Sequence, residues 1–304
     1  MSAVRPLLAG VELGGTKCIC ILGTGPDDIR AQIAISTGSD PGTTLRRIEN
    51  VLREWSAVHG GIEALGIASF GPIDLSRRSA TYGFITSTPK PGWRSTDVCG
   101  PLAGAFGVPV GFDTDVNGAA LAERCWGAAR GLEDFAYVTV GTGVGVGLIV
   151  NGRPVHGFGH PELGHIRIAR MRGDDWPGVC AFHGDCVEGL ASGGAIAARA
   201  GRPADDLASD SPIWEPVTDA LAQLVHTVML ATAPRRILIG GGVFTVRPEL
   251  FAAVRRRLIE SLQGYLNLSE LIGSIEEYLV PPGLGALAGP LGALALAVEA
   301  VAGY

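Results

Sequence analysis

The feature that most constrains the fold is a pattern that occurs twice, about 128 residues apart. In each copy a short apolar strand ends in a glycine-rich turn that contains threonine, and a second strand follows at once. The two turns are Leu13–Lys17 (LGGTK) and Gly141–Gly147 (GTGVGVG). A repeat of this kind predicts two similar α/β halves, each of which presents one hairpin turn. The second turn leads into a strand rather than a helix, which excludes a dinucleotide-binding fingerprint.

Both turns are candidate anion sites, because glycine lets backbone N–H groups approach a phosphate closely. An ordinary hairpin turn explains each of them when it is taken alone. Two such turns at equivalent positions of a duplicated chain favour contacts with one phosphate chain. The residues expected to make these contacts are Gly14, Gly15, Thr16 and Lys17 in the first turn and Gly141 and Thr142 in the second.

A third glycine-rich stretch, Gly240–Gly242, follows a buried strand expected at residues 236–239. Glycines at the end of a strand permit the close approach of a flat ligand such as an adenine ring, with Gly241 and Gly242 as the contacts. A tight turn from strand to helix explains the same residues, and this alternative stays open.

The apolar strand expected at residues 62–68 ends in a turn-forming loop, residues 69–74. Ligands collect at the carboxyl ends of strands in open α/β sheets, so this loop, with Gly71 and Pro72, is expected to form a wall of the site. The later segment 82–93 is polar, turn-rich and dotted with aromatic side chains. Such a composition is typical of a lid or specificity loop, and also of a plain surface connection.

Three polar residues follow the strand expected at residues 108–112, just before a helix begins. We interpret Asp113 as an N-cap or turn residue. Asp115 is the candidate catalytic group, because a carboxylate at this position can accept a proton from a bound hydroxyl. Asn117 would then fix the orientation of the substrate.

The stretch 160–188 contains four potential metal ligands within 22 residues, and they are His165, Cys180, His183 and Cys186. Two thiolates and two imidazoles suit a closed tetrahedral zinc site, in which the metal orders a loop of low apolar content. Two free cysteines and two surface histidines are the alternative, but the Cys-x2-His-x2-Cys spacing favours zinc. Glu162 and Glu188 flank the cluster, and we interpret them as substrate contacts.

Composition limits the class of protein and its partners. With 304 residues, 47% hydrophobic and 18% charged, the chain is globular and long enough for two domains. The net charge of −6 argues against nucleic acid, and the basic run Arg255–Arg257 fits a solvated helix face. The apolar stretch 284–298 is interrupted by glycine and proline, which predicts a buried C-terminal helix and no membrane span.

The remaining cysteines and the N-terminus bear on the compartment. The four cysteines outside the metal cluster form no disulfide framework, which favours a reducing cytoplasm. The N-terminal residues run straight into a strand and a glycine turn, so we expect no signal peptide.

Together these motifs resemble those of the ROK family of sugar kinases and repressors, over nearly the whole chain. The matching motifs are Gly14–Lys17, Asp115–Asn117, Gly141–Gly143, Glu162–His165, the metal loop through Glu188, and Gly240–Gly242. The resemblance implies a duplicated actin-like (ribonuclease H-like) α/β ATPase fold, with two domains around a cleft. We expect an α/β domain at residues 1–117 and a larger one at 118–304, with an inserted zinc loop (165–186) and a last helix that could pack back on the first domain.

The resemblance also implies the roles of the site residues, with ATP and a sugar as substrates. Asp115 would be the general base that takes the proton from the sugar hydroxyl. The residues that would hold the other hydroxyls are Asn117, Glu162, His165 and Glu188, and His165 would also ligate zinc. The phosphates would lie on the turns at Gly14–Thr16 and Gly141–Thr142, and the adenosine on Gly241–Gly242. Mg²⁺ would bridge ATP oxygens near Glu12, zinc would be structural, and the protein would form a homodimer.

Within the family the chain is most similar to the bacterial fructokinases. The similarity lies in Glu12, the loop Ser69–Asp74, the segment Thr86–Trp93 and the metal spacing with His183 at its centre. Most other ROK kinases have Asp in place of Glu12 and begin the metal loop with Cys-x-Cys. The resemblance therefore implies phosphorylation of D-fructose at its 6-hydroxyl, with mannose or glucose as alternative substrates.

Two other classes share these motifs. ROK repressors carry an N-terminal winged helix-turn-helix, and we expect none here because the first glycine turn is reached by Gly14. A sugar-binding protein without turnover would lack the carboxylate of Asp115, which is present.

Overall fold

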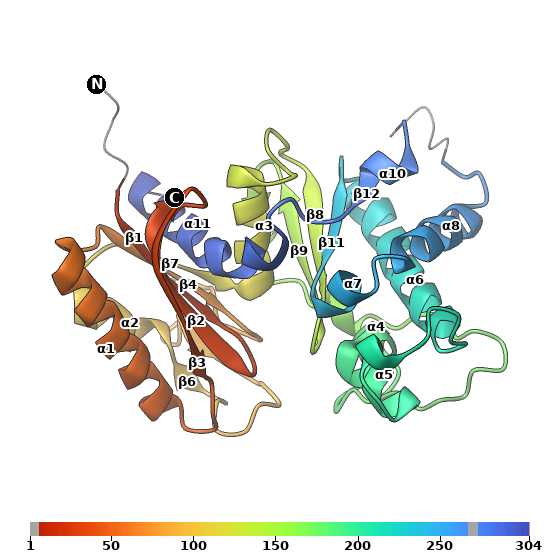
Figure 1. The fold of residues 1–304 in the computed structure, drawn as a ribbon, viewed down its shortest axis with the longest axis horizontal. Coiled ribbons are helices and arrows are strands. Elements are labelled where there is room, and N and C mark those ends of the chain that lie inside the picture. Colours follow the sequence, from red (N-terminus) through yellow and green to blue (C-terminus); the bar gives the residue numbers. More distant parts are fainter. Residues whose placement is uncertain (1–5, 267–272, 304) are drawn as a thin grey trace. The chain divides into compact units, whose positions relative to one another are not determined.

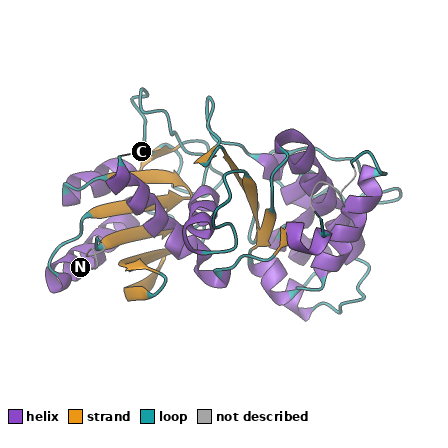
Figure 2. Ribbon diagram, turned by 90° about the horizontal axis from the view of Figure 1, so that it is seen from above, coloured by secondary structure: helices purple, strands orange, loops and turns teal. Residues whose placement is uncertain are grey.

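The computed structural model describes residues 6–266 and 273–303, which divide into two compact units. The first unit contains the residues up to Arg130, the segment Val155–His160 and the residues from Ala286 onward. The second unit contains Gly131–Pro154 and Pro161–Gly285. Each unit is a β-sheet with helices packed on it (Figures 1 and 2).

A five-stranded sheet with the order β3-β2-β1-β4-β7 forms the framework of the first unit (Figure 1). Its strands are β1 (Leu8–Leu13), β2 (Lys17–Gly25), β3 (Asp28–Ser36), β4 (Ala64–Ser69) and β7 (Val110–Thr114). The first three strands are antiparallel neighbours, whereas β4 runs parallel to β1, and β7 parallel to β4. β4 is buried at every position, as expected for a strand that is covered on both faces.

Helices cover both faces of this sheet (Figure 1). α1 (Pro41–His59) and α2 (Cys99–Phe106) pack on one face over an apolar core that includes Val11 and Leu13 of β1. α11 (Ala288–Ala302) lies on the other face, toward which Gly10 and Glu12 of the same strand point. Because side chains alternate along a strand, β1 supplies both core residues and the carboxylate of Glu12.

α11 fits closely onto the sheet because the strands present glycine to it. A Cβ atom at Gly10 would lie 2.8 Å from Cβ of Ala293, and one at Gly66 or Gly111 would overlap carbonyl groups of the helix. Among the described residues, the stretch Gly285–Ala302 is long and apolar enough to cross a membrane by length and composition alone. Its burial against the glycines accounts for that apolar character without a membrane.

The division between the units differs from the expected one at 117/118. α3 (Asp115–Trp126) belongs to the first unit, because it packs against α11 and β4. At their crossing, a Cβ atom at Gly118 would lie 3.2 Å from the backbone of Gly292. The first unit therefore continues to Arg130, and α11 lies in it as well.

The sheet of the second unit repeats the topology of the first, with the order β10-β9-β8-β11-β12. Its strands are β8 (Phe135–Val140), β9 (Val144–Val150), β10 (Arg153–Pro154), β11 (Ile237–Gly240) and β12 (Leu279–Val280). β8, β9 and β10 are antiparallel neighbours, and β11 runs parallel to β8 and β12, as β4 does to β1 and β7. The predicted repeat and the duplicated actin-like fold are confirmed.

The helices of the second unit are α4 (Val187–Ala191), α5 (Gly193–Ala200), α6 (Trp214–Thr232), α7 (Gly242–Val246), α8 (Leu250–Leu262) and α10 (Ile275–Tyr278). Ser192 separates α4 from α5 with extended backbone angles, and its side chain accepts a hydrogen bond from the Ala195 N–H as the N-cap of α5.

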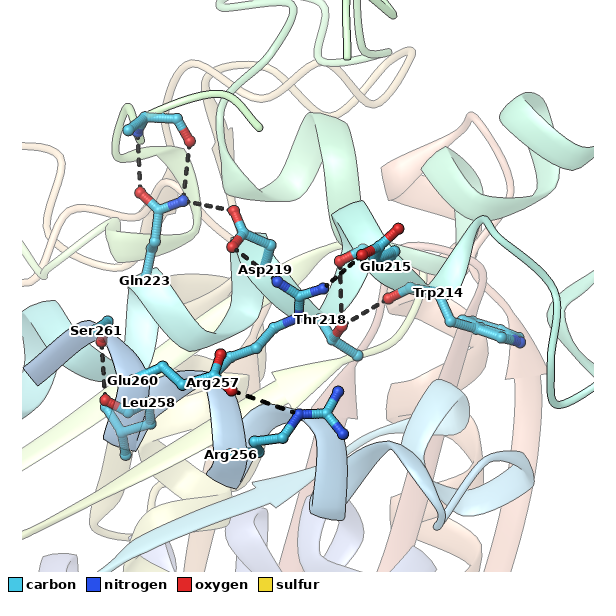
Figure 3. A network of polar contacts seen from close by, with 11 residues as sticks. Trp214, Glu215, Thr218, Asp219, Gln223, Arg256, Arg257, Leu258, Glu260 and Ser261 are labelled. Atoms are coloured by element: carbon cyan, nitrogen blue, oxygen red, sulfur yellow. Dashed lines mark hydrogen bonds and ion pairs between the residues drawn. The ribbon is translucent and has the colours of Figure 1, made fainter. Parts of the chain in front are cut away.

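α6 and α8 are joined by a polar network (Figure 3). The Arg257 guanidinium of α8 contacts Glu215 at 3.4 Å and Asp219 at 3.3 Å on α6. One turn further along α6, Oε1 of Gln223 accepts a hydrogen bond from the Ala169 N–H at 2.9 Å, and its Nε2 donates to the Ala169 carbonyl at 2.8 Å. α6 is thereby fixed both to α8 and to the predicted metal loop, which contains Ala169.

Candidate active site

Strand register brings the predicted site residues of the first unit to one edge of its sheet. Leu13 pairs with Ser69, and Ser69 pairs with Thr114, so β1, β4 and β7 end side by side. The loops that follow these strands carry the glycine turn, the Gly71–Pro72 pair and the start of α3. The carboxyl-end arrangement predicted from the sequence is therefore present.

Asp115 and Glu12 are the two carboxylates at this edge. Asp115 is the first residue of α3, and its Oδ1 accepts a hydrogen bond from the Val116 N–H at 2.8 Å. It is only partly covered, yet burial of its carboxyl raises its pKa to about 6. The pKa of Glu12 is raised to about 7 by burial and, second, by the charge of Asp115, while Lys17 opposes the rise. In such a pair, Asp115 can accept a proton while Glu12 lies near a bound cation.

Asn117 is held from two sides at the start of α3. Its N–H donates to Oγ1 of Thr114 at 3.1 Å, and its side-chain Nδ2 donates to Oδ1 of Asp113 at 2.8 Å. Thr114 is therefore the N-cap and Asp113 belongs to β7, so the interpretation of Asp113 as an N-cap or turn residue is wrong. Asp113 is 3% exposed and also accepts from the Thr114 N–H at 2.7 Å, so its role is to orient its neighbours.

The first glycine turn is open on its outer side and supported on its inner side. Gly14 N–H donates to the Lys17 carbonyl at 3.1 Å, and nothing lies within 4 Å of a Cβ built on Gly15. Thr37, which follows β3, donates from Oγ1 to the Gly14 carbonyl at 2.7 Å and from its N–H to the Thr16 carbonyl at 3.1 Å. The turn can therefore present backbone groups to an anion while Thr37 keeps its shape.

The loop with Gly71 and Pro72 and the segment 82–93 are packed against this framework. Thr86 donates from its N–H and its Oγ1 to the Pro72 carbonyl, at 2.7 and 3.0 Å. Trp93 is fully buried, and its indole N–H donates to the Gly38 carbonyl at 3.0 Å. The buried Trp93 thus anchors the segment 82–93 to the chain that follows β3. A plain surface connection would not need such an anchor.

The second glycine turn is braced by Glu188, at the start of α4. Oε2 of Glu188 accepts from the Val144 N–H at 3.1 Å, and a Cβ on Gly143 would lie 2.5 Å from the same oxygen. Gly193 at the start of α5 donates from its N–H to the Gly141 carbonyl at 2.7 Å. A side chain at 143 would displace the Glu188 carboxylate from this position, a constraint that the sequence alone did not indicate.

Gly241 and Gly242 lie beside this turn. Gly241 has a φ of 91°, and a Cβ there would overlap the backbone of Val140, which ends β8. Nothing lies within 4 Å of a Cβ built on Gly242, the first residue of α7. A tight turn explains Gly241, whereas the open side at Gly242 leaves space for a ligand.

The four predicted metal ligands converge within the second unit. The ligand atoms of His165, Cys180, His183 and Cys186 all lie within 4.8 Å of one another. Sγ of Cys180 lies 3.6 Å from Nδ1 of each histidine, and Sγ of Cys186 lies 3.5 Å from Nδ1 of His165. Zinc–ligand bonds of about 2.3 Å to sulfur and about 2.0 Å to nitrogen, at tetrahedral angles, give a sulfur–nitrogen separation of about 3.5 Å. The cluster therefore has the dimensions of a closed zinc site.

His165 connects this cluster to the carboxylates. Its Nδ1 faces the sulfur atoms, while its Nε2 lies 3.9 Å from Oε1 of Glu188. Glu162 precedes the short 3₁₀ helix Leu163–His165, and its carbonyl accepts from the His165 N–H at 2.9 Å. His165 is thus linked to the backbone of Glu162 and to the carboxylate of Glu188, whereas the role of the two glutamates as substrate contacts stays a prediction.

Ion pairs hold the rest of the metal loop. Arg170 contacts Asp185 at 3.0 Å and Asp174 at 3.2 Å, and it donates to the Trp176 carbonyl at 2.7 Å. Arg199 of α5 contacts Asp174 at 2.7 Å. Because few apolar side chains of the loop are buried, these charged contacts and the proposed metal would keep it ordered.

Comparisons with known proteins agree with this geometry. The model of the ROK family matches residues 8–300. The fructokinase of Pediococcus pentosaceus is 39% identical over 295 residues, 97% of this chain and 99% of that protein. The fructokinase of Zymomonas mobilis is 41% identical over 293 residues, 95% of this chain and 96% of that protein. The crystal structure of a ROK hexokinase from Thermus thermophilus aligns with a TM-score of 0.77 and 26% identity, and the alignment covers 98% of this chain and 100% of that one. The chain therefore belongs to the ROK family.

Proposed function

We propose that this protein is an ATP-dependent fructokinase that phosphorylates D-fructose at its 6-hydroxyl. The observation that carries the proposal is the carboxylate of Asp115, beside a glycine turn, in a chain about 40% identical to fructokinases over nearly its full length. A pKa of about 6 leaves this carboxylate largely ionised at neutral pH, yet basic enough to accept a proton.

In the proposed reaction the hydroxyl oxygen of the sugar attacks the γ-phosphorus of ATP and the bond to ADP breaks. Asp115 accepts the hydroxyl proton as the new phosphorus–oxygen bond forms. Phosphoryl transfer needs positioning and charge stabilisation more than covalent chemistry. Asp115 would supply the base, and the turns at Gly14–Lys17 and Gly141–Thr142 would bind phosphate.

Three groups would assist without taking the proton. Mg²⁺ held near Glu12 would neutralise charge on the phosphate oxygens when it is bound with ATP. Hydroxyls of the sugar would bind Asn117, Glu162, His165 and Glu188. Zinc would be structural, because four protein ligands leave no coordination site for a reacting water. It would hold His165 in position for the sugar.

Mannose and glucose remain the alternative substrates, because related hexoses differ at only a few hydroxyl positions. A non-catalytic sugar-binding regulator is disfavoured by the presence of Asp115. The homodimer and the cytoplasmic location stay predictions that rest on the resemblance to the family.

The test measures ADP release with ATP and Mg²⁺ against fructose, mannose and glucose, for the wild type and for Asp115→Ala. We expect the highest kcat/KM with fructose and a loss of about 10³-fold or more in kcat for the variant. Equal or better kcat/KM with glucose would overturn the substrate assignment. A folded, zinc-loaded protein without turnover on any hexose would instead support the binding-protein alternative.

A further inference from the structure

A six-residue segment of the chain, Val155–His160, is attached to the first unit although both of its neighbours in sequence belong to the second. Here it is named the histidine strap. Nε2 of His160 accepts a hydrogen bond from the Ile73 N–H at 3.0 Å, and Nε2 of His156 lies 2.9 Å from Oδ2 of Asp113. The strap is thus fixed at one end to the loop that follows β4 and at the other to Asp113 near the end of β7, where the sugar is proposed to bind.

Asp113 links the strap to a proposed substrate contact. Its Oδ2 faces His156, and its Oδ1 accepts from the Thr114 N–H and from Nδ2 of Asn117. The side chain of Asp113 is 5% exposed, and a buried carboxylate is costly unless charge and hydrogen bonds compensate it. His156 is the group that can supply a positive charge to it.

The contact to Asp113 also fixes which atom Asn117 offers to a ligand. Since Nδ2 donates to Asp113, the amide of Asn117 cannot turn without breaking that bond. Its Oδ1 is thereby kept as an acceptor of fixed direction. A sugar hydroxyl that donates to this oxygen would meet it already oriented.

We propose that His156 is a positioning residue for the sugar, which acts by holding Asp113 and, through it, the amide of Asn117. This inference rests on the proposed function and adds to it a residue outside every motif that the sequence made conspicuous. His156 touches neither substrate nor ATP in this role, so its removal should change the affinity for the sugar and leave the response to ATP unchanged.

Tyr82 interacts electrostatically with Asp113 and with Cys99, and neither Tyr82 nor Cys99 titrates near neutral pH. Tyr82 has a raised pKa, chiefly because it is buried, and burial raises the pKa of the Cys99 thiol to about 11. The Arg77 guanidinium lies 5.7 Å from the centre of the Tyr82 ring. The hydrogen bond to Asp113 raises the pKa of His156 above its ordinary value of 6.5. Protonated His156 therefore persists to higher pH than an isolated histidine, and its charge is lost as the pH rises further.

The experiment compares His156→Ala and His156→Gln with the wild type, each as the full chain loaded with zinc. For His156→Ala we expect KM for fructose to rise about tenfold, because a charge-assisted hydrogen bond to a buried carboxylate is lost. KM for ATP should stay within about twofold, and thermal unfolding checks that the variant is folded. The control is His226→Gln, which removes a partly buried histidine bonded to Ser261 at 2.8 Å in the second unit.

Glutamine separates the hydrogen bond from the charge. His156→Gln can still donate to Asp113, so it should recover most of the affinity for fructose. It should also remove the part of the pH dependence of KM that the wild type shows as His156 loses its proton. Asp115 and Glu12 titrate in the same range, and because both variants retain them, the difference between variant and wild type isolates His156.

Two outcomes would overturn the inference. One is a KM for fructose within twofold of the wild type in His156→Ala, and the other is an equal rise in KM for ATP. NMR titration of His156 tests the pair without activity: in Asp113→Asn its pKa should fall toward about 6.5. A protein inactive on every hexose would defeat the proposed function, whereas an unchanged His156 pKa in Asp113→Asn would defeat the pair itself.

Discussion

The two units share a strand order but hold their functional groups by different means. In the first unit, the site residues follow three parallel strands, and α11 packs against the same strands through Gly10, Gly66 and Gly111. In the second unit, the loop that carries the predicted site residues follows the short strand β10, and its ordered core is four potential metal ligands and several ion pairs.

The difference concerns what must be present before the predicted site residues of each unit are held in place. Close packing of an apolar helix fixes those of the first unit, and it needs no added component. A cation would fix those of the second unit, because the chain there buries too little apolar surface to order itself. Folding alone would then complete one copy of the duplicated scaffold, whereas the other copy would depend on metal.

Removal of the proposed zinc should have the largest effect, and that effect should be confined to the second unit. A chelator, or Cys180→Ser, should abolish hydrogen-exchange protection of residues 163–192, since structural zinc contributes on the order of 10 kcal/mol to such sites. Amides of α11 in the first unit should keep their protection. Sugar-dependent turnover should fall with zinc content, because His165 and Glu188 would lose their fixed positions.

The control for metal removal is Cys125→Ser, which changes a cysteine of α3 outside the cluster. It should keep full zinc content and the exchange pattern of the wild type. Uniform loss of protection in both units after chelation would contradict the comparison, because it would show that the first unit also depends on the metal.

Local patterns in the sequence were sufficient to predict the duplicated fold and the metal cluster. Each strand–turn–strand copy is contiguous in the sequence, and Cys180, His183 and Cys186 are each three residues apart. Both features can therefore be recognised without knowing which distant residues are in contact. Asp115 and Asn117 were predicted for the same reason, since they follow directly on an apolar strand. Their roles in catalysis stay predictions.

What the sequence did not reveal depends on partners that are far apart along the chain. Thr37 supports Gly14 from 23 positions away, and nothing about a single threonine after a strand marks it. His156 reaches Asp113 across 43 positions, through a segment that leaves its own unit. The boundary expected after Asn117 was wrong for the same reason. α3 belongs to the first unit because it packs against α11, which lies near the other end of the chain.

An intermediate effect should come from Gly66→Ala, which tests whether close packing holds the first unit. The new Cβ would overlap the carbonyl of Ala293, so α11 must shift, at a cost of about 3 kcal/mol in the free energy of unfolding. Gly104→Ala is the matched control: nothing lies within 4 Å of its Cβ, and alanine should stabilise α2 by up to about 1 kcal/mol. Urea denaturation measures both, and equal stability of the two variants would refute the packing account.

The smallest expected effect is that of the Asp115 carboxylate on the free energy of unfolding. Burial raises the pKa of Asp115 from 3.8 to about 6, so the folded state holds its proton more tightly than the unfolded state. Stability from this group is complete below about pH 4 and is lost as the pH rises to about 6. Asp115→Asn removes that loss, and at pH 8 we expect the inactive variant to be about 2 kcal/mol more stable than the wild type.

The sign of this effect can be checked by denaturation at several pH values. The advantage of Asp115→Asn should grow between about pH 4 and pH 6 and stay level above that range. Relief of the repulsion with Glu12 acts in the same direction, because the charge of Asp115 is one cause of the raised pKa of Glu12. Asp28→Asn, at a partly exposed residue whose carboxylate contacts Thr24 and Arg30, should change stability by less than about 0.5 kcal/mol. If Asp115→Asn were less stable than the wild type at pH 8, the carboxylate would be a structural support, and the first unit would depend on its charges as the second depends on its metal.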